Sequence, residues 1–247
     1  PIPLELTTHC DAPVGSGLGA SSTLVVSMIG AFVEFLKLPL DDYEIAQLAY
    51  HIERIECGLK GGKQDQYSAA FGGFNFIEFY ANNRTLVNPL RLKESIICEL
   101  ESSLLLFYSG ISRESSKIIE DQTKSITNGF ENELDAMHCL KKEAIEMKES
   151  LLKGDFKKFV DSMNLGWENK KRTSKVVSNE YIEDILQKAR NAGALAGKIS
   201  GAGGGGFILL FVPTEKRMDV IRALSNFNGQ ISNCHFTKSG IQSWCFE

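Results

Sequence analysis

The sequence predicts an α+β protein of two domains, and three observations lead to this class. A helical region follows a loop near the start, and a second region from 115 to about 192 is almost wholly helical in its spacing, with breaks expected at 128–129, at 154–155 and around 178–179. Runs of aromatic and branched residues predict strands at 74–79 and 103–107, which flank the expected domain boundary. From about residue 194 the chain is expected to form a strand, a glycine loop, a strand, a helix and then strands around 230–236 and 241–246, which is typical of half of a ferredoxin-like fold.

The first element is a glycine-rich loop directly before an apolar helix. Gly15, Gly17 and Gly19 allow positive φ, so that consecutive N–H groups can converge on an anion. Apolar residues recur at helical spacing from Ser21 onward, which places the loop at a helix N-terminus with its unpaired amides and positive dipole end. Ser21 and Ser22 can cap this end or contact a metal. The run therefore predicts a phosphate-binding loop.

Other phosphate loops fit this stretch less well. No G-x-x-x-x-G-K-[ST] sequence occurs. Gly15-x-Gly17-x-x-Ala20 fits the dinucleotide fingerprint, but a second helix follows in place of the required strand. That helix is expected to begin at Asp41, with Glu44 completing a capping box. Its buried stripe is expected to comprise Ile45, Leu48, Ala49, Ile52 and Ile55.

A second glycine cluster spans 201–206 and also matches G-x-G-x-x-G. It runs into the strand expected at 207–212, so it links two strands and opens no helix. A tight hairpin is the simpler interpretation. Each glycine costs about 0.5 to 1 kcal/mol relative to alanine in regular structure, so four in succession indicate that something must pass close to this backbone. A protein kinase is not indicated, because neither H-R-D nor D-F-G follows.

A third segment lies between the two glycine clusters. It contains a helix end with Glu53 and Glu56, a glycine turn, and then Lys63 close to Asp65. In this order, the three segments resemble motifs of the GHMP kinases, the family of galactokinase, homoserine kinase, mevalonate kinase and phosphomevalonate kinase. The stretches that begin at Asp65, Phe107 and Gly240 look most like those of D-glycero-D-manno-heptose 7-phosphate kinases, and sugar-1-kinases such as fucokinase come next.

The resemblance implies a fold. The N-terminal domain, expected over 1–98, would be similar to the second domain of ribosomal protein S5, and the C-terminal domain, expected over 99–247, would be ferredoxin-like. Members of the family normally carry a strand region with substrate contacts ahead of the phosphate loop, whereas this loop begins at Pro13. We therefore expect the chain to be a fragment that lacks the N-terminal strands.

The resemblance also implies site residues. Asp65 matches the aspartate that takes the proton from the sugar hydroxyl, and Lys63 could neutralise charge or lower the pKa of Asp65. The alternatives are that Asp65 caps the helix that starts near Gln66 and that Lys63 is a solvated lysine. Nucleotide contacts are implied for Pro13, Gly15, Gly17, Leu18, Gly19, Ala20, Ser21 and Ser22, and for Gly201, Gly203 and Gly204.

The implied metal ligands are Glu53 and Ser21. Many members of the family have a serine at the position of Ala20, so Ser21 or Ser22 must replace it here. Glu56 is the second candidate for the carboxylate. The expected substrate residues are Asp65, Ser112 and Arg113. Arg113 follows the end of the strand that starts near Phe107, and its planar guanidinium could bind the sugar's own phosphate; a structural ion pair is the alternative.

The implied reaction uses ATP and Mg²⁺ to phosphorylate the anomeric hydroxyl of a sugar, with D-glycero-D-manno-heptose 7-phosphate converted to the 1,7-bisphosphate. The alternatives are another sugar-1-kinase, such as fucokinase, and a non-catalytic sugar-sensing relative. A net charge of −4 over 247 residues gives no electrostatic footprint for nucleic acid or membrane. We expect a small-molecule sugar partner and a cytoplasmic location, and we leave a homodimer open.

Overall fold

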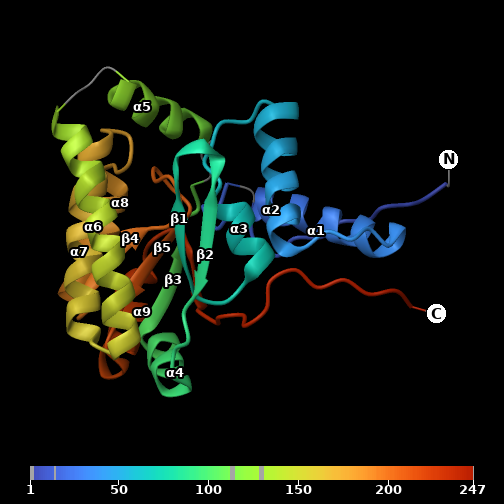
Figure 1. Cartoon of the computed structure of the whole chain (residues 1–247). Helices are drawn as coiled ribbons and strands as arrows, with labels where there is room; N and C mark the ends of the chain where they lie inside the picture. Colours follow the sequence, from blue (N-terminus) through green and yellow to red (C-terminus); the bar gives the residue numbers. More distant parts are fainter. Residues whose placement is uncertain (1–2, 14, 112–114, 128–130, 247) are drawn as a thin grey trace.

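The computed structural model describes residues 3–13, 15–111, 115–127 and 131–246, which form two groups of packed elements (Figure 1). The first group contains three helices, a π-helical turn and a two-stranded antiparallel hairpin. These are α1 (Ala20–Leu36), α2 (Asp42–His51), the turn Ile52–Glu56, α3 (Gln64–Phe71), β1 (Asn75–Phe79), the 3-10 turn Ala81–Asn83 and β2 (Thr85–Pro89). Their shared core is drawn from the facing sides of the helices and from β2.

The starts of α1 and α2 confirm the predictions for this region. Gly19 lies before α1 in the left-handed conformation, and the capping box of α2 is complete, since Asp41 and Glu44 each accept from the other's backbone N–H at 2.9 Å. The predicted stripe of α2 is partly wrong, because Leu48 and Ile55 are exposed. Ala46 takes part in the core instead, and the π-helical turn alters the angular spacing around Ile55.

The second group is a four-stranded antiparallel sheet with helices on both faces. Its strand order β4-β5-β3-β6, with a helix before β4 and another before β6, is the βαββαβ arrangement of a ferredoxin-like domain, as predicted. Its elements are α4 (Glu94–Ser103), β3 (Leu104–Tyr108), α5 (Ser115–Thr127), α6 (Glu131–Lys153), α7 (Phe156–Thr173), α8 (Glu180–Asn191), β4 (Ala196–Ile199), β5 (Phe207–Phe211), the 3-10 turn Thr214–Lys216, α9 (Arg217–Leu224) and β6 (Gln230–Asn233).

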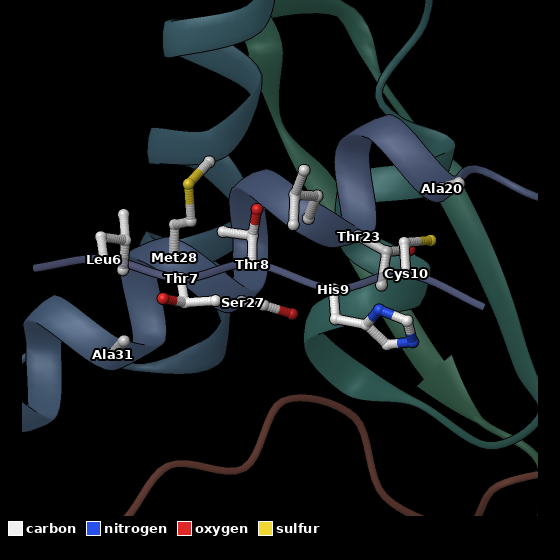
Figure 2. A pocket seen from close by; sticks show the side chains of 11 residues that line it. Leu6, Thr7, Thr8, His9, Cys10, Ala20, Thr23, Ser27, Met28 and Ala31 are labelled. Carbon is white, nitrogen blue, oxygen red and sulfur yellow. The ribbon is translucent and has the colours of Figure 1, made fainter. Parts of the chain in front are cut away.

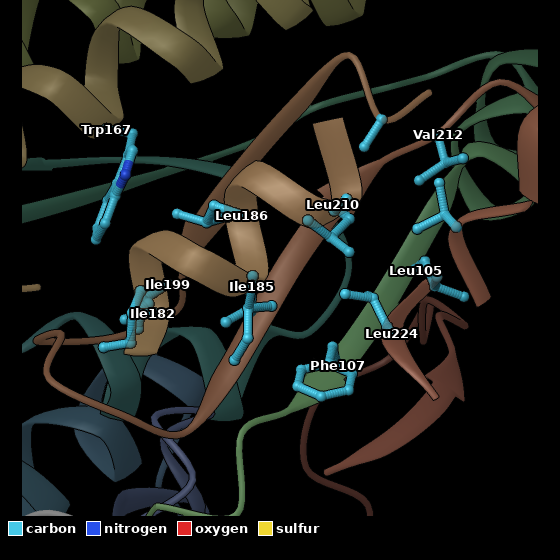
Figure 3. Close-up of a cluster of buried hydrophobic side chains, with 14 of the residues drawn as sticks. Leu105, Phe107, Trp167, Ile182, Ile185, Leu186, Ile199, Leu210, Val212 and Leu224 are labelled. Atoms are coloured by element: carbon cyan, nitrogen blue, oxygen red, sulfur yellow. The ribbon is translucent and has the colours of Figure 1, made fainter. Parts of the chain in front are cut away.

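The two faces of this sheet carry separate cores because side chains alternate along each strand. Leu105 and Phe107 of β3 face α8 and α9, where they meet Ile182, Ile185 and Leu224 (Figure 3). The opposite face packs against α6 and α7. Burial of the sheet on both sides fixes the ends of β4 and β5, and hence the position of the glycine cluster that joins them.

The helical region breaks where the sequence predicts. Asp155 accepts from Lys158 N at 3.1 Å and caps α7, and Asn179 caps α8 in the same way. The break expected at 128–129 lies outside the described residues. The hairpin strand β2 and helix α4 were not anticipated. None of the helices within the described ranges has both the length and the apolar character needed to cross a membrane.

The strand predicted at 241–246 is wrong. The segment after β6 has no ladder partner in the described chain and returns along the first group of elements instead (Figure 1). There Ile241 N donates to Ala70 O at 3.2 Å, and the Ile241 side chain packs at Gly30 of α1. Ile241 therefore packs against helices rather than within a sheet, whereas Trp244 and Phe246 are exposed. The boundary expected after residue 98 falls inside α4, which packs with the second group, and we therefore propose that the two domains divide just before Glu94.

Candidate active site

The predicted phosphate loop leads into α1 with its amides open to a ligand. Gly17 and Gly19 have φ of 78° and 72°, values at which a β-carbon is strained. Within the described residues no side chain caps the start of α1, and the first backbone bond of this turn is Thr23 N to Gly19 O at 2.9 Å. The N–H groups of Ala20, Ser21 and Ser22 are thus left without a helical partner, as a helix start that binds an anion requires.

The second glycine cluster packs directly against this loop. Ser200 Oγ donates to Gly17 O at 3.0 Å, and Phe207 N donates to Ser16 O at 2.9 Å. A β-carbon on Gly17 would lie 2.8 Å from Ser200 O, and one on Gly201 would lie 2.7 Å from Gly17 O. The sequence predicted that something passes close to the backbone of the second glycine cluster. Part of what passes there is the phosphate loop itself.

The later glycines of the cluster turn toward a different segment. Gly204 N donates to Val177 O at 2.7 Å, and a β-carbon on Gly203 would lie 2.7 Å from the same carbonyl oxygen. These contacts tie the cluster to the loop between α7 and α8. Contact of Gly203 and Gly204 with a nucleotide stays a prediction.

Glu53 lies in the π-helical turn and is almost fully buried, with 2% of its surface exposed. Ser21 Oγ donates to Glu53 Oε1 at 3.3 Å, and Gln66 Nε2 donates both to Glu53 Oε2 and, at 3.1 Å, to Ser22 Oγ. The structure therefore brings Ser21 rather than Ser22 to the free side of this carboxylate. Glu56, the second candidate, is exposed and bonds to His51 at 3.0 Å.

Asp65 lies in the first turn of α3 and faces the phosphate loop. A β-carbon on Gly19 would lie 3.1 Å from Asp65 Cγ, so the carboxyl borders the loop directly. Lys63 holds the N-cap position of α3 and no side chain caps it, so the capping role considered for Asp65 is wrong. Asp65 and Gly19 line a pocket of about 400 Å³ together with Leu18, Thr23 and the returning segment around Ser239.

The surroundings of Asp65 raise its pKa. The side chain reaches solvent at the pocket, yet withdrawal of its carboxyl from water by the surrounding protein is the largest cause, and the negative charge of Glu53 acts in the same direction. The positive charge of Arg54 opposes both and lowers the pKa. A carboxyl with a raised pKa beside a phosphate loop is typical of a group that exchanges a proton.

Arg54 is the site residue that the sequence analysis missed. Its Nε donates to Gly62 O at 3.3 Å, its Nη1 lies 4.0 Å from Glu53 Oε1, and its guanidinium occupies the space where a side chain on Gly61 would lie. The only available signal was the glycine turn eight residues further on. The effect expected of Lys63 on Asp65 is not seen, because the Lys63 ammonium contacts Asn83 Oδ1 and lies over the Tyr50 ring.

Two predicted substrate residues, Ser112 and Arg113, lie outside the described residues. A second pocket runs between the extended segment 6–10 and α1 (Figure 2). Its described lining is mainly apolar and hydroxyl side chains with His9, and it contains neither Asp65 nor Glu53. Of these two pockets, as the described residues line them, the one at Asp65 brings a carboxyl group to the phosphate loop.

Comparison with known proteins identifies the class. The family model of the GHMP kinases N terminal domain matches residues 2–73, and that of the GHMP kinases C terminal matches residues 147–230. The chain belongs to the GHMP kinases, as the motifs and the two-part fold indicate.

The relatives narrow this class to its sugar kinases. The chain is 48% identical over 244 residues to the D-glycero-alpha-D-manno-heptose 7-phosphate kinase of Campylobacter jejuni, a match that covers 99% of this chain and 71% of the relative. The crystal structure of a D-glycero-D-manno-heptose 1-phosphate kinase from Bacteroides thetaiotaomicron is 43% identical with a TM-score of 0.76, and the match covers 96% of this chain but 66% of that one. The L-fucokinase/L-fucose-1-P guanylyltransferase of Bacteroides fragilis is 27% identical over 246 residues, which are 26% of its length.

Proposed function

We propose that this protein transfers the γ-phosphoryl group of ATP to the anomeric hydroxyl of D-glycero-D-manno-heptose 7-phosphate and forms the 1,7-bisphosphate. One observation carries the proposal: the Asp65 carboxyl borders the phosphate loop at Gly19 inside a pocket of about 400 Å³. The names of the two heptose phosphate kinases support the choice of sugar. A reaction that consumes ATP also supports the cytoplasm as its location.

Phosphoryl transfer depends mainly on positioning and charge neutralisation. In the proposed mechanism the open amides at the start of α1 hold the nucleotide phosphates, and the two packed glycine segments keep this loop rigid. Asp65 accepts the proton of the sugar hydroxyl as the oxygen attacks phosphorus. The positive charge of Arg54 lowers the pKa of Asp65 against the larger effect of burial, and so favours the ionised form that accepts the proton.

The residues present fit a magnesium ion. Mg²⁺ is usually held by one or two carboxylates together with water and substrate phosphates. Glu53 is a buried carboxylate whose Oε1 lies 3.3 Å from the Ser21 hydroxyl at the start of α1, which is an arrangement of hard oxygens beside the phosphate position. The described residues contain no group of three or more acidic, histidine or cysteine side chains suited to a metal, so the phosphates must supply further ligands. When bound, Mg²⁺ neutralises charge on the transferred group.

Replacement of Glu53 tests this metal role. We expect Glu53→Gln to raise the Mg²⁺ concentration needed for half-maximal rate by about tenfold or more, because a carboxylate among few hard ligands is lost. Glu56→Gln is the matched control on the same turn, and we expect no change because Glu56 is exposed and bonds to His51. A Mg²⁺ titration of the rate in both variants measures this effect. A higher Mg²⁺ requirement in Glu56→Gln, with none in Glu53→Gln, would assign the metal to Glu56.

The pH dependence of the rate tests the role of Arg54. Asp65 acts as a base only when ionised, so kcat/KM should fall as pH drops through its raised pKa. Arg54→Gln removes the charge that lowers this pKa, and we therefore expect the acidic limb of the profile to move to higher pH. Lys63→Gln should leave that limb in place, since Lys63 contacts Asn83 instead. A shift with Lys63→Gln and none with Arg54→Gln would contradict this account.

An ADP-release assay on the full-length protein tests the substrate. We expect ADP formation with heptose 7-phosphate to exceed that with heptose 1-phosphate, fucose, galactose and mannose. The heptose 1-phosphate arm is needed because the names of the two relatives differ in the position of the phosphate. Greater turnover of fucose would favour the function of the Bacteroides fragilis relative. Sugar binding without any ADP release would indicate a sugar-sensing protein.

A further inference from the structure

Two lysines lie beneath the second glycine cluster. Lys170, in the last turn of α7, donates from Nζ to Gly201 O. Lys198 lies in β4, two residues before Ser200, and α7 packs against this strand. Both side chains are half-buried. Lys170 thus contacts the glycine loop directly, and Lys198 lies on the strand that leads into it.

The charges of this pair are poorly compensated. Across the described residues, neither ammonium lies within ion-pair distance of a carboxylate. Glu143 is the acid that acts on Lys198; it is 5% exposed, its Oε1 accepts from Asn169 Nδ2, and its Oε2 has no partner. Burial is the largest cause in raising the pKa of Glu143, and the charge of Glu146 acts in the same direction, while the Asn169 hydrogen bond and the charge of Lys198 oppose it.

The pKa values of both lysines reflect this arrangement. Burial is the larger cause and the charge of Lys198 the smaller in lowering the pKa of Lys170 to about 8. Burial also lowers the pKa of Lys198, and Glu143 opposes this effect. The neighbouring Lys171, unlike Lys170 and Lys198, has carboxylate partners: it pairs with Glu168 at 2.9 Å and with Glu183 at 3.6 Å. Withdrawing two like charges from water is costly unless an anion joins them.

The position of the pair indicates which anion. Gly201, whose carbonyl accepts from Lys170, is the residue that packs against Gly17 of the phosphate loop. The Lys170 ammonium and the phosphate loop therefore both approach the backbone of Gly201. A phosphate dianion could take the place of the Gly201 oxygen as acceptor, since an ammonium carries three donors and the side chain is flexible.

We propose that Lys170 and Lys198 form a phosphate-binding subsite beside the start of α1 and hold a phosphate group of one of the two reactants. The subsite rests on the proposed function, in which both ATP and a sugar phosphate are bound. The phosphate comes either from the sugar or from the nucleotide. The phosphate supplies the negative charge that neither ammonium has as a partner. Both ammonium groups are then attracted to the same anion, which offsets the repulsion between them.

Steady-state kinetics distinguish the two sources. We expect Lys170→Gln and Lys198→Gln each to raise one KM by about tenfold or more, as the loss of a charge-assisted contact does. A rise confined to heptose 7-phosphate, with ATP unchanged, assigns the subsite to the sugar; a rise confined to ATP assigns it to the nucleotide. Lys170→Arg should retain most of the affinity. Lys171→Gln is the matched control and should change neither KM. Two unchanged KM values in the Lys170 and Lys198 variants would overturn the proposal.

Binding of inorganic phosphate tests the subsite independently of turnover. We expect millimolar phosphate to raise the Tm of the wild-type protein and of Lys171→Gln, and to raise that of the Lys170→Gln/Lys198→Gln double variant less. If the protein turns over no heptose phosphate yet shows this difference, the proposed function fails and the subsite stands. An equal shift in all three proteins would overturn the subsite even if the kinase activity is confirmed.

Discussion

Asp65→Asn lowers kcat by about 10²- to 10⁴-fold, the range that a general base contributes. Asparagine keeps the shape of the side chain beside Gly19 but cannot accept the proton of the sugar hydroxyl. The nucleotide Kd should stay nearly unchanged because the backbone N–H groups at the start of α1, and not the Asp65 carboxyl, hold the phosphates. Single-turnover kinetics with ATP in excess, combined with calorimetric titration of the nucleotide, measure both quantities.

The same variant has a defined effect on stability. Because the folded protein raises the pKa of Asp65, the ionised carboxyl disfavours the fold at pH values above that raised pKa. Removal of the charge should therefore leave Tm unchanged or slightly higher. Asp42→Asn, which changes an exposed carboxylate in the first turn of α2, is the control and should alter neither kcat nor nucleotide binding. A kcat for Asp65→Asn within a factor of a few of the wild type would contradict the assignment.

Gly19→Ala should weaken nucleotide binding by about 10- to 100-fold, the cost of one or more lost bonds to a charged group. The added β-carbon would enter the loop at φ 72° and lie 3.1 to 3.3 Å from the Asp65 side chain. The carboxyl must then shift, so kcat should fall as well. Calorimetric titration of ATP and steady-state rates measure the two effects.

Gly58→Ala is the matched control for this substitution. Gly58 has a similar φ of 65°, but a β-carbon there would have no atom within 4 Å. Its conformational strain is therefore comparable, and its steric effect is absent. Equal loss of nucleotide affinity in the two variants would show that strain alone, and not the space beside Asp65, explains the result.

Local sequence patterns predicted the elements whose structure depends on local chemistry. The capping residues Asp41, Asp155 and Asn179 mark helix starts because each accepts a backbone N–H within its own turn. The glycine cluster after β4 was also placed correctly between two strands. The motifs then indicated the family, since the glycine loops and Asp65 occur in a fixed order along the chain.

Features that depend on long-range packing could not be predicted in this way. The end of the segment after β6 is rich in apolar and aromatic residues, as strands are, but Ile241 packs on α1 and α3, which only the tertiary structure brings to it. Arg54 was missed because the π-helical turn sets its direction and the opposing glycine turn accepts it. The approach of Ser200 to Gly17 spans 183 residues of sequence, so the glycines indicated close contact without identifying the partner.

The most direct test of the proposed chemistry is ³¹P NMR of a reaction that contains the full-length protein, Mg²⁺, ATP and heptose 7-phosphate. The account predicts a new phosphate resonance coupled to the anomeric proton, with the 7-phosphate resonance retained and ADP formed in equal amount. The Asp65→Asn protein should produce this signal far more slowly. A new resonance coupled to any other sugar proton, or ADP formed with inorganic phosphate alone, would contradict phosphorylation of the anomeric hydroxyl by this site.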